Sequence, residues 1–187
     1  MTFYKAKDIV KQGTVSILAS VTISSFAGAI LNARLETLLT IPILLVLVPC
    51  ISDMTGNIGC MIGSKIATYL HLGLVRPKIE RNVYLERYAI AIIVVTVISS
   101  IYLVFLAMAA SYLLELSAIE PLKILIIVVS TGLSISAAAI LVGIVVAFVT
   151  FKYGWDPDNT AIPIVTAIGD IVGALMLLSI ASAVGLI

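Results

Sequence analysis

The chain has 187 residues, of which 61% are hydrophobic and 11% charged, and its formal net charge is +1. Soluble domains carry about 25% charged residues, so water is not the main solvent of this chain. The small net charge gives no field that would attract nucleic acid, which excludes that class of partner. At this length the sequence predicts one transmembrane domain, 1–187, that is all-α, polytopic and surrounded by membrane lipid.

Five apolar runs predict five transmembrane helices, at about 14–33, 38–74, 88–114, 122–151 and 161–187. Each run is long enough to cross a hydrocarbon core of about 30 Å at about 1.5 Å per residue. The first run is rich in small and hydroxyl residues, which allow close approach of neighbouring helices. The polar, basic segment before it is followed by no cleavage site, so the first run is expected to be a retained helix.

The second run is too long for one regular span and is interrupted by Pro42, Pro49 and the polar passage 52–59. It predicts a broken or kinked second helix. Irregular backbone at this depth would free carbonyl oxygens that can bind ions. Asp53 and Asn57 would share one face of a helical turn, and a simple kink is the alternative interpretation of the passage.

Lysine and arginine residues predict the orientation, because they collect in cytoplasmic loops. With a cytoplasmic N-terminus, the outside would hold Arg34 and Lys123, and Lys65 would lie within the second run. The cytoplasmic side would then hold eight residues: Lys5, Lys7, Lys11, Arg76, Lys78, Arg81, Arg87 and Lys152. The sequence therefore predicts a multi-pass protein of the cell (plasma) membrane, with its C-terminus outside.

Asp170 is the residue most indicative of function, because it lies nine residues into the last run. That position is about 14 Å past Ala161 at helical rise, near mid-membrane. A carboxylate facing lipid there costs at least about 2.5 kcal/mol, so the side chain is expected to face protein or water. Asn159, Pro163 and Thr166 share its helix face. An ion or proton site is indicated, and a buried structural aspartate among packed small residues is the alternative.

A third acidic group precedes the last run, where Asp156 would lie at a cytoplasmic mouth or simply cap the helix. The polar groups at membrane depth carry oxygen ligands, which suit hard divalent cations such as magnesium or calcium. Cys50, Cys60 and His71 are interpreted as structural residues. The serines have no HExxH or GxSxG context, so the chain is predicted not to be an enzyme and to need no cofactor.

Two motifs resemble those of a known family. The segment 49–65, PCISDMTGNIGCMIGSK, resembles the second-helix signature of MgtE-type magnesium transporters. The segment 156–163, DPDNTAIP, followed by Gly169 and Asp170, is similar to a pattern in the eukaryotic solute-carrier branch of that family. A departure is Met61, where bacterial members carry Gln. The eukaryotic relatives carry two copies of a five-helix domain, whereas this chain carries one.

The resemblance implies a homodimer, or pairing with a sister chain, whose pore lies at a two-fold interface. Asp170 would be the pore aspartate that holds a largely hydrated magnesium ion, the transported and bound metal. Thr166 and the carbonyl of Ile162 would line the pore toward the cytoplasm. Asp156 would lie at its mouth, and Asn57, supported by Asp53, would be the amide of the second-helix motif.

The sequence thus predicts a magnesium channel or transporter that passes a largely hydrated divalent cation through a dimeric pore. One alternative is a sodium- or proton-coupled divalent cation exchanger, in which Asp170 and Asp53 alternate between ions. The other is a non-transporting membrane scaffold subunit, whose polar residues make hydrogen bonds between helices.

Overall fold

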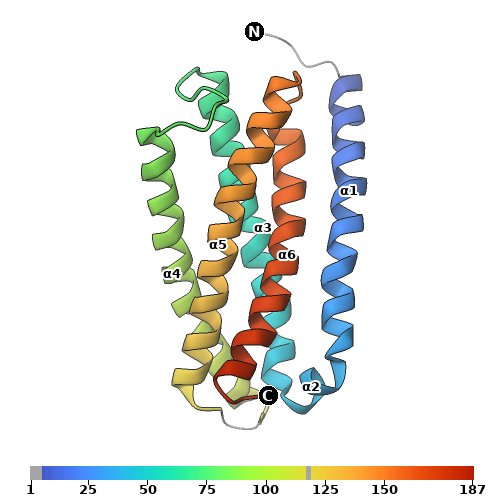
Figure 1. Ribbon diagram of the computed structural model, residues 1–187. Helices are drawn as coiled ribbons and strands as arrows, with labels where there is room; N and C mark the ends of the chain where they lie inside the picture. The colour runs from blue at the N-terminus through green and yellow to red at the C-terminus, as the bar shows by residue number, and fades with distance from the viewer. Residues whose placement is uncertain (1–5, 117–118) are drawn as a thin grey trace.

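The computed structural model describes residues 6–116 and 119–187. Figure 1 shows these residues as a bundle of long, roughly parallel and antiparallel helices, and no strand occurs among them. In chain order the helices are α1 (Ala6–Ala33), α2 (Leu35–Thr40), α3 (Pro42–His71), α4 (Val83–Leu113), α5 (Pro121–Lys152) and α6 (Pro157–Ala183). The predicted all-α fold is confirmed.

The five long helices α1, α3, α4, α5 and α6 are each apolar and long enough to cross a membrane. Their lengths run from 27 to 32 residues, more than the roughly 20 that a span needs. The prediction of a polytopic protein with five spans is therefore confirmed. The helices extend beyond several predicted runs; α1, for example, extends back to Ala6, because no proline separates its polar start from the apolar run and the single Gly13 between them costs only about 1 kcal/mol relative to alanine.

The predicted break in the second run occurs at Pro42, one of the three interruptions that the sequence indicated. Ile41 has φ −127° and ψ 77°, and separates the short α2 from α3. The cause is Pro42, which disfavours helical geometry in the residue before it and occupies the first turn of α3.

The polar passage 52–59 is regular helix, so the prediction that it is irregular and frees carbonyl oxygens was wrong. Local hydrogen bonds within α3 accommodate its polar side chains. Thr55 Oγ1 donates to the carbonyl oxygen of Ile51 at 2.9 Å, and Asn57 Nδ2 donates to Asp53 Oδ2 at 3.1 Å. The helix also continues through Pro49.

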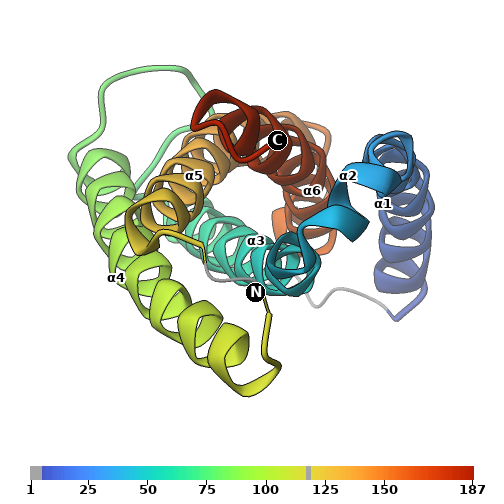
Figure 2. The same cartoon turned by 90° about the horizontal axis from the view of Figure 1, so that it is seen from below.

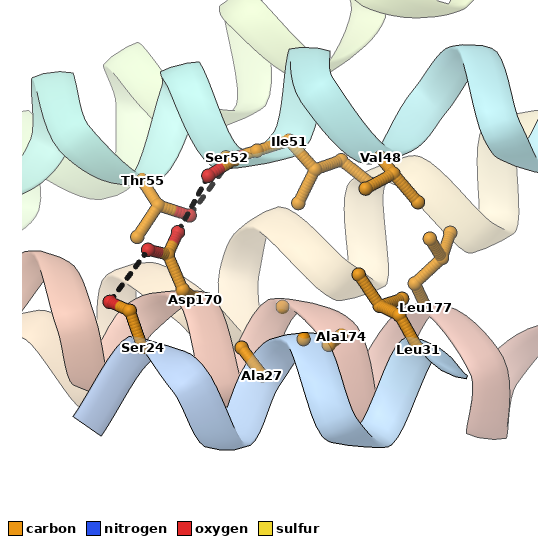
Figure 3. A pocket seen from close by; sticks show the side chains of 12 residues that line it. Ser24, Ala27, Leu31, Val48, Ile51, Ser52, Thr55, Asp170, Ala174 and Leu177 are labelled. Carbon is orange, nitrogen blue, oxygen red and sulfur yellow. Dashed lines mark hydrogen bonds between the residues drawn. The ribbon is translucent and has the colours of Figure 1, made fainter. Parts of the chain in front are cut away.

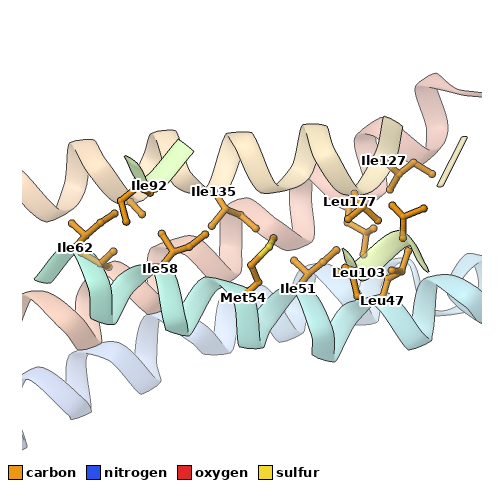
Figure 4. Close-up of a cluster of buried hydrophobic side chains, with 14 of the residues drawn as sticks. Leu47, Ile51, Met54, Ile58, Ile62, Ile92, Leu103, Ile127, Ile135 and Leu177 are labelled. Atoms are coloured by element: carbon orange, nitrogen blue, oxygen red, sulfur yellow. The ribbon is translucent and has the colours of Figure 1, made fainter. Parts of the chain in front are cut away.

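Helix α6 packs against α1, α3 and α5, while α4 packs against α3 and α5, so that α1 and α4 lie on opposite sides of the bundle (Figure 2). The apolar core lies between α3, α4, α5 and α6, with Ile51, Ile62, Ile135 and Leu177 among its members (Figure 4). Helix α1 lies to one side. Its backbone packs only on α6 and α2 among the described helices, and it buries only Gln12, Ser16 and Ala27.

Two glycines set the distance between α3 and α6. A Cβ atom on Gly59 would lie 2.7 Å from Thr166 Oγ1, and one on Gly63 would lie 2.5 Å from Ile162 Cγ1. These glycines are four residues apart on one face of α3, a spacing that lets two membrane helices approach closely. The close contact fixes the position of α6 relative to α3, and with it the level of Asp170.

Candidate functional site: a carboxylate groove at mid-span

The carboxylate of Asp170 is held by two serines from two other helices (Figure 3). Ser52 Oγ of α3 donates to Asp170 Oδ1 at 2.8 Å, and Ser24 Oγ of α1 donates to Asp170 Oδ2 at 3.4 Å. Each carboxylate oxygen therefore has its own hydroxyl donor. Because the two donors come from different helices, this pair holds the carboxylate in one orientation.

Asp170 opens into a partly open cavity of about 210 Å³ that residues of α1, α3 and α6 line together. We call this cavity the Asp170 groove. Its polar lining comes from Ser24, Ser52, Thr55 and Asp170, and its apolar lining includes Leu31 and Leu177 (Figure 3). Because the backbones of α1 and α3 do not pack on one another, the groove lies between them with α6 as its floor.

The groove lies near the middle of the spans. Asp170 is about 20 Å along α6 from Pro157, in a helix about 40 Å long. Ser52 is about 15 Å along α3 from Pro42. A charged carboxylate at such a depth is costly against lipid and is a functional feature by default. The mid-span position predicted for Asp170 agrees with its place in α6.

Thr166 and Ile162 lie along α6 between Asp170 and the start of that helix. Both are half-buried, and both lie against the glycines of α3 at Gly59 and Gly63. Thr166 therefore lies one turn from Asp170 on the contact between α3 and α6.

Asp53 and Asn57 lie on another side of α3, hydrogen-bonded to one another at 3.1 Å. They line a second cavity of about 480 Å³ between α3 and α4, which also contains Thr96 and Tyr102. Adjacent residues of a helix point about 100° apart, so Ser52 reaches the Asp170 groove whereas Asp53 does not. The structure of one chain thus separates Asp53 and Asn57 from Asp170.

Asp156 lies at the end of the bundle where α6 begins, about 21 Å along the helix from Asp170. It is the N-cap residue, and its Oδ1 accepts a hydrogen bond from the Asp158 N–H at 3.0 Å. The same oxygen lies 3.5 Å from His71 Nε2. Asp156 therefore caps α6, which was the structural alternative for this residue, and its carboxylate lies near the end of the bundle.

A buried glutamine joins α1 to this end of α6. Gln12 Oε1 accepts hydrogen bonds from the Asp156 N–H at 3.1 Å and from Asn159 Nδ2 at 3.3 Å. The side chain is only 6% exposed. Gln12 and the two serines of the Asp170 groove were missed by sequence reasoning, since no spacing within one helix shows which residue of α1 faces which residue of α6.

The site offers few ligands for a bare metal ion. Within the described ranges 6–116 and 119–187, no group of three or more His, Cys, Asp or Glu side chains could hold a metal. One carboxylate and hydroxyl oxygens can instead accept hydrogen bonds from the water molecules of a hydrated cation.

Five long apolar helices and a mid-span carboxylate in a polar groove define a polytopic membrane protein with an ionisable site inside the bilayer. The family model MgtE, described as a divalent cation transporter, matches residues 48–180. This match covers most of the chain, from within α3 to near the end of α6, and the chain belongs to the MgtE family. It is therefore a divalent cation transporter. Searches of curated proteins and of solved structures gave no significant match.

Proposed function

We propose that the transported ion is magnesium, that it passes largely hydrated, and that Asp170 is its central ligand. The observation that carries this proposal is the Asp170 carboxylate, which opens into a polar groove at mid-span. Magnesium loses its water reluctantly and is usually bound through one or two carboxylates. A single carboxylate flanked by hydroxyls suits an ion that keeps its hydration shell.

We further propose that a second copy of the chain completes the pore. One chain leaves α1 sparsely buried and leaves the groove between α1 and α3 open. A two-fold arrangement that faces two grooves toward one another would place two Asp170 carboxylates around one path. Two negative charges favour a divalent over a monovalent cation.

The other predicted site residues have supporting places in this proposal. Thr166 and the carbonyl of Ile162 line the path from Asp170 toward Asp156, whose carboxylate raises the local cation concentration at the mouth. Asp53 and Asn57 form a separate polar site in the cavity between α3 and α4. We propose the plasma membrane as the location, with the end that carries Asp156 on the cytoplasmic side, as the distribution of lysine and arginine favours.

The test uses purified protein in liposomes that contain a magnesium-sensitive dye. Wild type should carry magnesium inward, and Asp170→Asn, which keeps the shape but removes the charge, should abolish the flux. Calcium, manganese and sodium are added as competitors, and a proton or sodium gradient is imposed in parallel. Flux that requires either gradient would identify a coupled exchanger, and full flux in the Asn variant would overturn the role of Asp170.

The dimer is tested by mixing. If both copies of Asp170 are needed, equal co-expression of wild type and Asp170→Asn leaves about one quarter of dimers fully wild type. Flux should then fall to about one quarter of the wild-type value at equal total protein. A fall to one half would show that each chain conducts alone.

A further inference from the structure

Two hydroxyl side chains in the Asp170 groove behave differently from their neighbours. On α1, Thr22 donates to the Leu18 carbonyl and Ser25 donates to the Thr22 carbonyl. On α3, Ser64 donates to the Cys60 carbonyl of its own helix. Serine and threonine in membrane helices commonly bond back to their own backbone in this way.

Ser24 and Ser52 instead donate across the groove to the two oxygens of Asp170. The backbones of their helices do not pack on one another, so Asp170 receives a hydrogen bond from each side of the groove (Figure 3). We propose that Ser24 and Ser52 determine specificity at the Asp170 site, holding the hydration shell of a divalent cation together with the carboxylate. This inference rests on the proposed function. It adds one residue of α1 and one of α3 to the groups that hold the hydrated ion.

The size of the groove supports a hydrated ion. A water molecule needs about 10–15 Å³ of such space, so a groove of about 210 Å³ has room for several waters. Magnesium is octahedral, and a fully hydrated ion carries about six.

The hydrogen-bonding capacity of Asp170, Ser24 and Ser52 also supports the binding of a hydrated ion. An ionised carboxylate has about four acceptor positions, and the two serines occupy two of them. The remaining positions, with the lone pairs of both serine oxygens, can accept hydrogen bonds from the waters of the ion. The site therefore offers acceptors at fixed points on three helices.

Fixed acceptors discriminate by the geometry of the shell. Magnesium holds its waters at about 2.0–2.1 Å in a regular octahedron, whereas calcium takes six to eight ligands at about 2.3–2.6 Å in flexible geometry. Loss of a serine hydroxyl removes an acceptor and frees the carboxylate to rotate. The expected consequence is reduced preference for magnesium over calcium.

The experiment compares Ser24→Ala, Ser52→Ala and the double variant with wild type in liposomes, measuring magnesium and calcium influx separately. Hexaamminecobalt(III) is the competing probe, because its ammine ligands do not exchange and can only donate hydrogen bonds. Each alanine variant should weaken inhibition by the probe about tenfold and lower the magnesium-to-calcium ratio, as expected for loss of one hydrogen bond in a charged network. Ser24→Thr, which keeps the hydroxyl, should restore both values.

Matched controls are Ser25→Ala in α1 and Ser64→Ala in α3, whose hydroxyls bond their own helices outside the groove. Both should behave as wild type. If the double serine variant conducts nothing, magnesium binding is measured in detergent as the magnesium-dependent rise in unfolding temperature, which should shrink.

An unchanged ion ratio and unchanged inhibition in the double variant would overturn the inference, as would an unchanged magnesium-dependent stabilisation in a non-conducting one. If Asp170→Asn abolishes flux while the serine variants match wild type, this inference alone fails. If Asp170→Asn conducts normally, the proposed function itself fails.

Discussion

Gly63 of α3 lies so close to Ile162 of α6 that a methyl group on the glycine would come within 2.5 Å of Ile162 Cγ1 and 3.3 Å of its backbone nitrogen. The backbone contact leaves little room for relief by side-chain rotation. Gly63→Val should therefore push the two helices apart, lower the free energy of unfolding by about 1–3 kcal/mol and reduce cation flux. Thermal unfolding in detergent and liposome flux measure these effects.

The matched control is Gly13→Ala in α1, because nothing lies within 4 Å of the added Cβ atom. Alanine in an open helical position is stabilising by about 0.5–1 kcal/mol relative to glycine. Equal destabilisation in both variants would show that the contact between α3 and α6 is not the cause.

At Thr131 of α5, in contrast to Gly63, a substitution should stabilise the protein. It is fully buried, at 0% exposure, and its Oγ1 is a buried side-chain polar atom without a hydrogen-bond partner within the described part of the chain. Thr131→Val keeps the shape and removes the hydroxyl, so the variant should be more stable by about 1 kcal/mol. The comparison is Ser100→Ala, because the hydroxyl of Ser100, which is also buried, has a partner: it donates to the sulfur of Met54 at 4.0 Å. A lower unfolding temperature for Thr131→Val would contradict the prediction.

The two mid-span carboxylates should differ in their effects. Asp170→Asn is expected to abolish flux, whereas Asp53→Asn should leave measurable flux, because Asp53 lies in the α3–α4 cavity outside the Asp170 groove. Flux measured on equal amounts of folded protein decides between them. Equal loss in both variants would show that the two carboxylates serve the same ion.

Gln12 should be important for holding α1. Gln12→Leu removes the acceptor for two hydrogen bonds at the start of α6 and should cost about 1 kcal/mol of stability, because two part-buried donors lose their partner. Thr14→Leu, at an exposed position of the same helix, is the control. The unfolding temperature in detergent measures both, and an unchanged value for Gln12→Leu would show that the two hydrogen bonds are dispensable.

Orientation can be tested by labelling single cysteines in a variant without Cys50 and Cys60. Ile79→Cys, 91% exposed in the loop after α3, should react with a membrane-impermeant thiol reagent only from the cytoplasmic side. Glu115→Cys, beyond the other end of α4, should react only from outside. The reverse pattern would invert the proposed topology.

The sequence was sufficient to predict the five spans and the mid-span position of Asp170, because hydropathy and helical rise are local properties. The break at Pro42 was also predicted, but the irregular backbone expected in the polar passage is absent, because hydrogen bonds within α3, such as that between Asn57 and Asp53, keep the passage helical. The partners of Asp170 could not be predicted. Ser24 is 146 residues away in the chain, and only packing brings the two together.

The placement of α1 has a consequence for biosynthesis. Its packing partners are the short α2, which follows it directly, and α6, the last of the described helices in chain order. At roughly 5–20 residues per second, the ribosome needs about 6 to 25 seconds to pass from the end of α1 to the start of α6. During that interval α1 lacks its main neighbour, and the polar groove forms only when α6 has been synthesised.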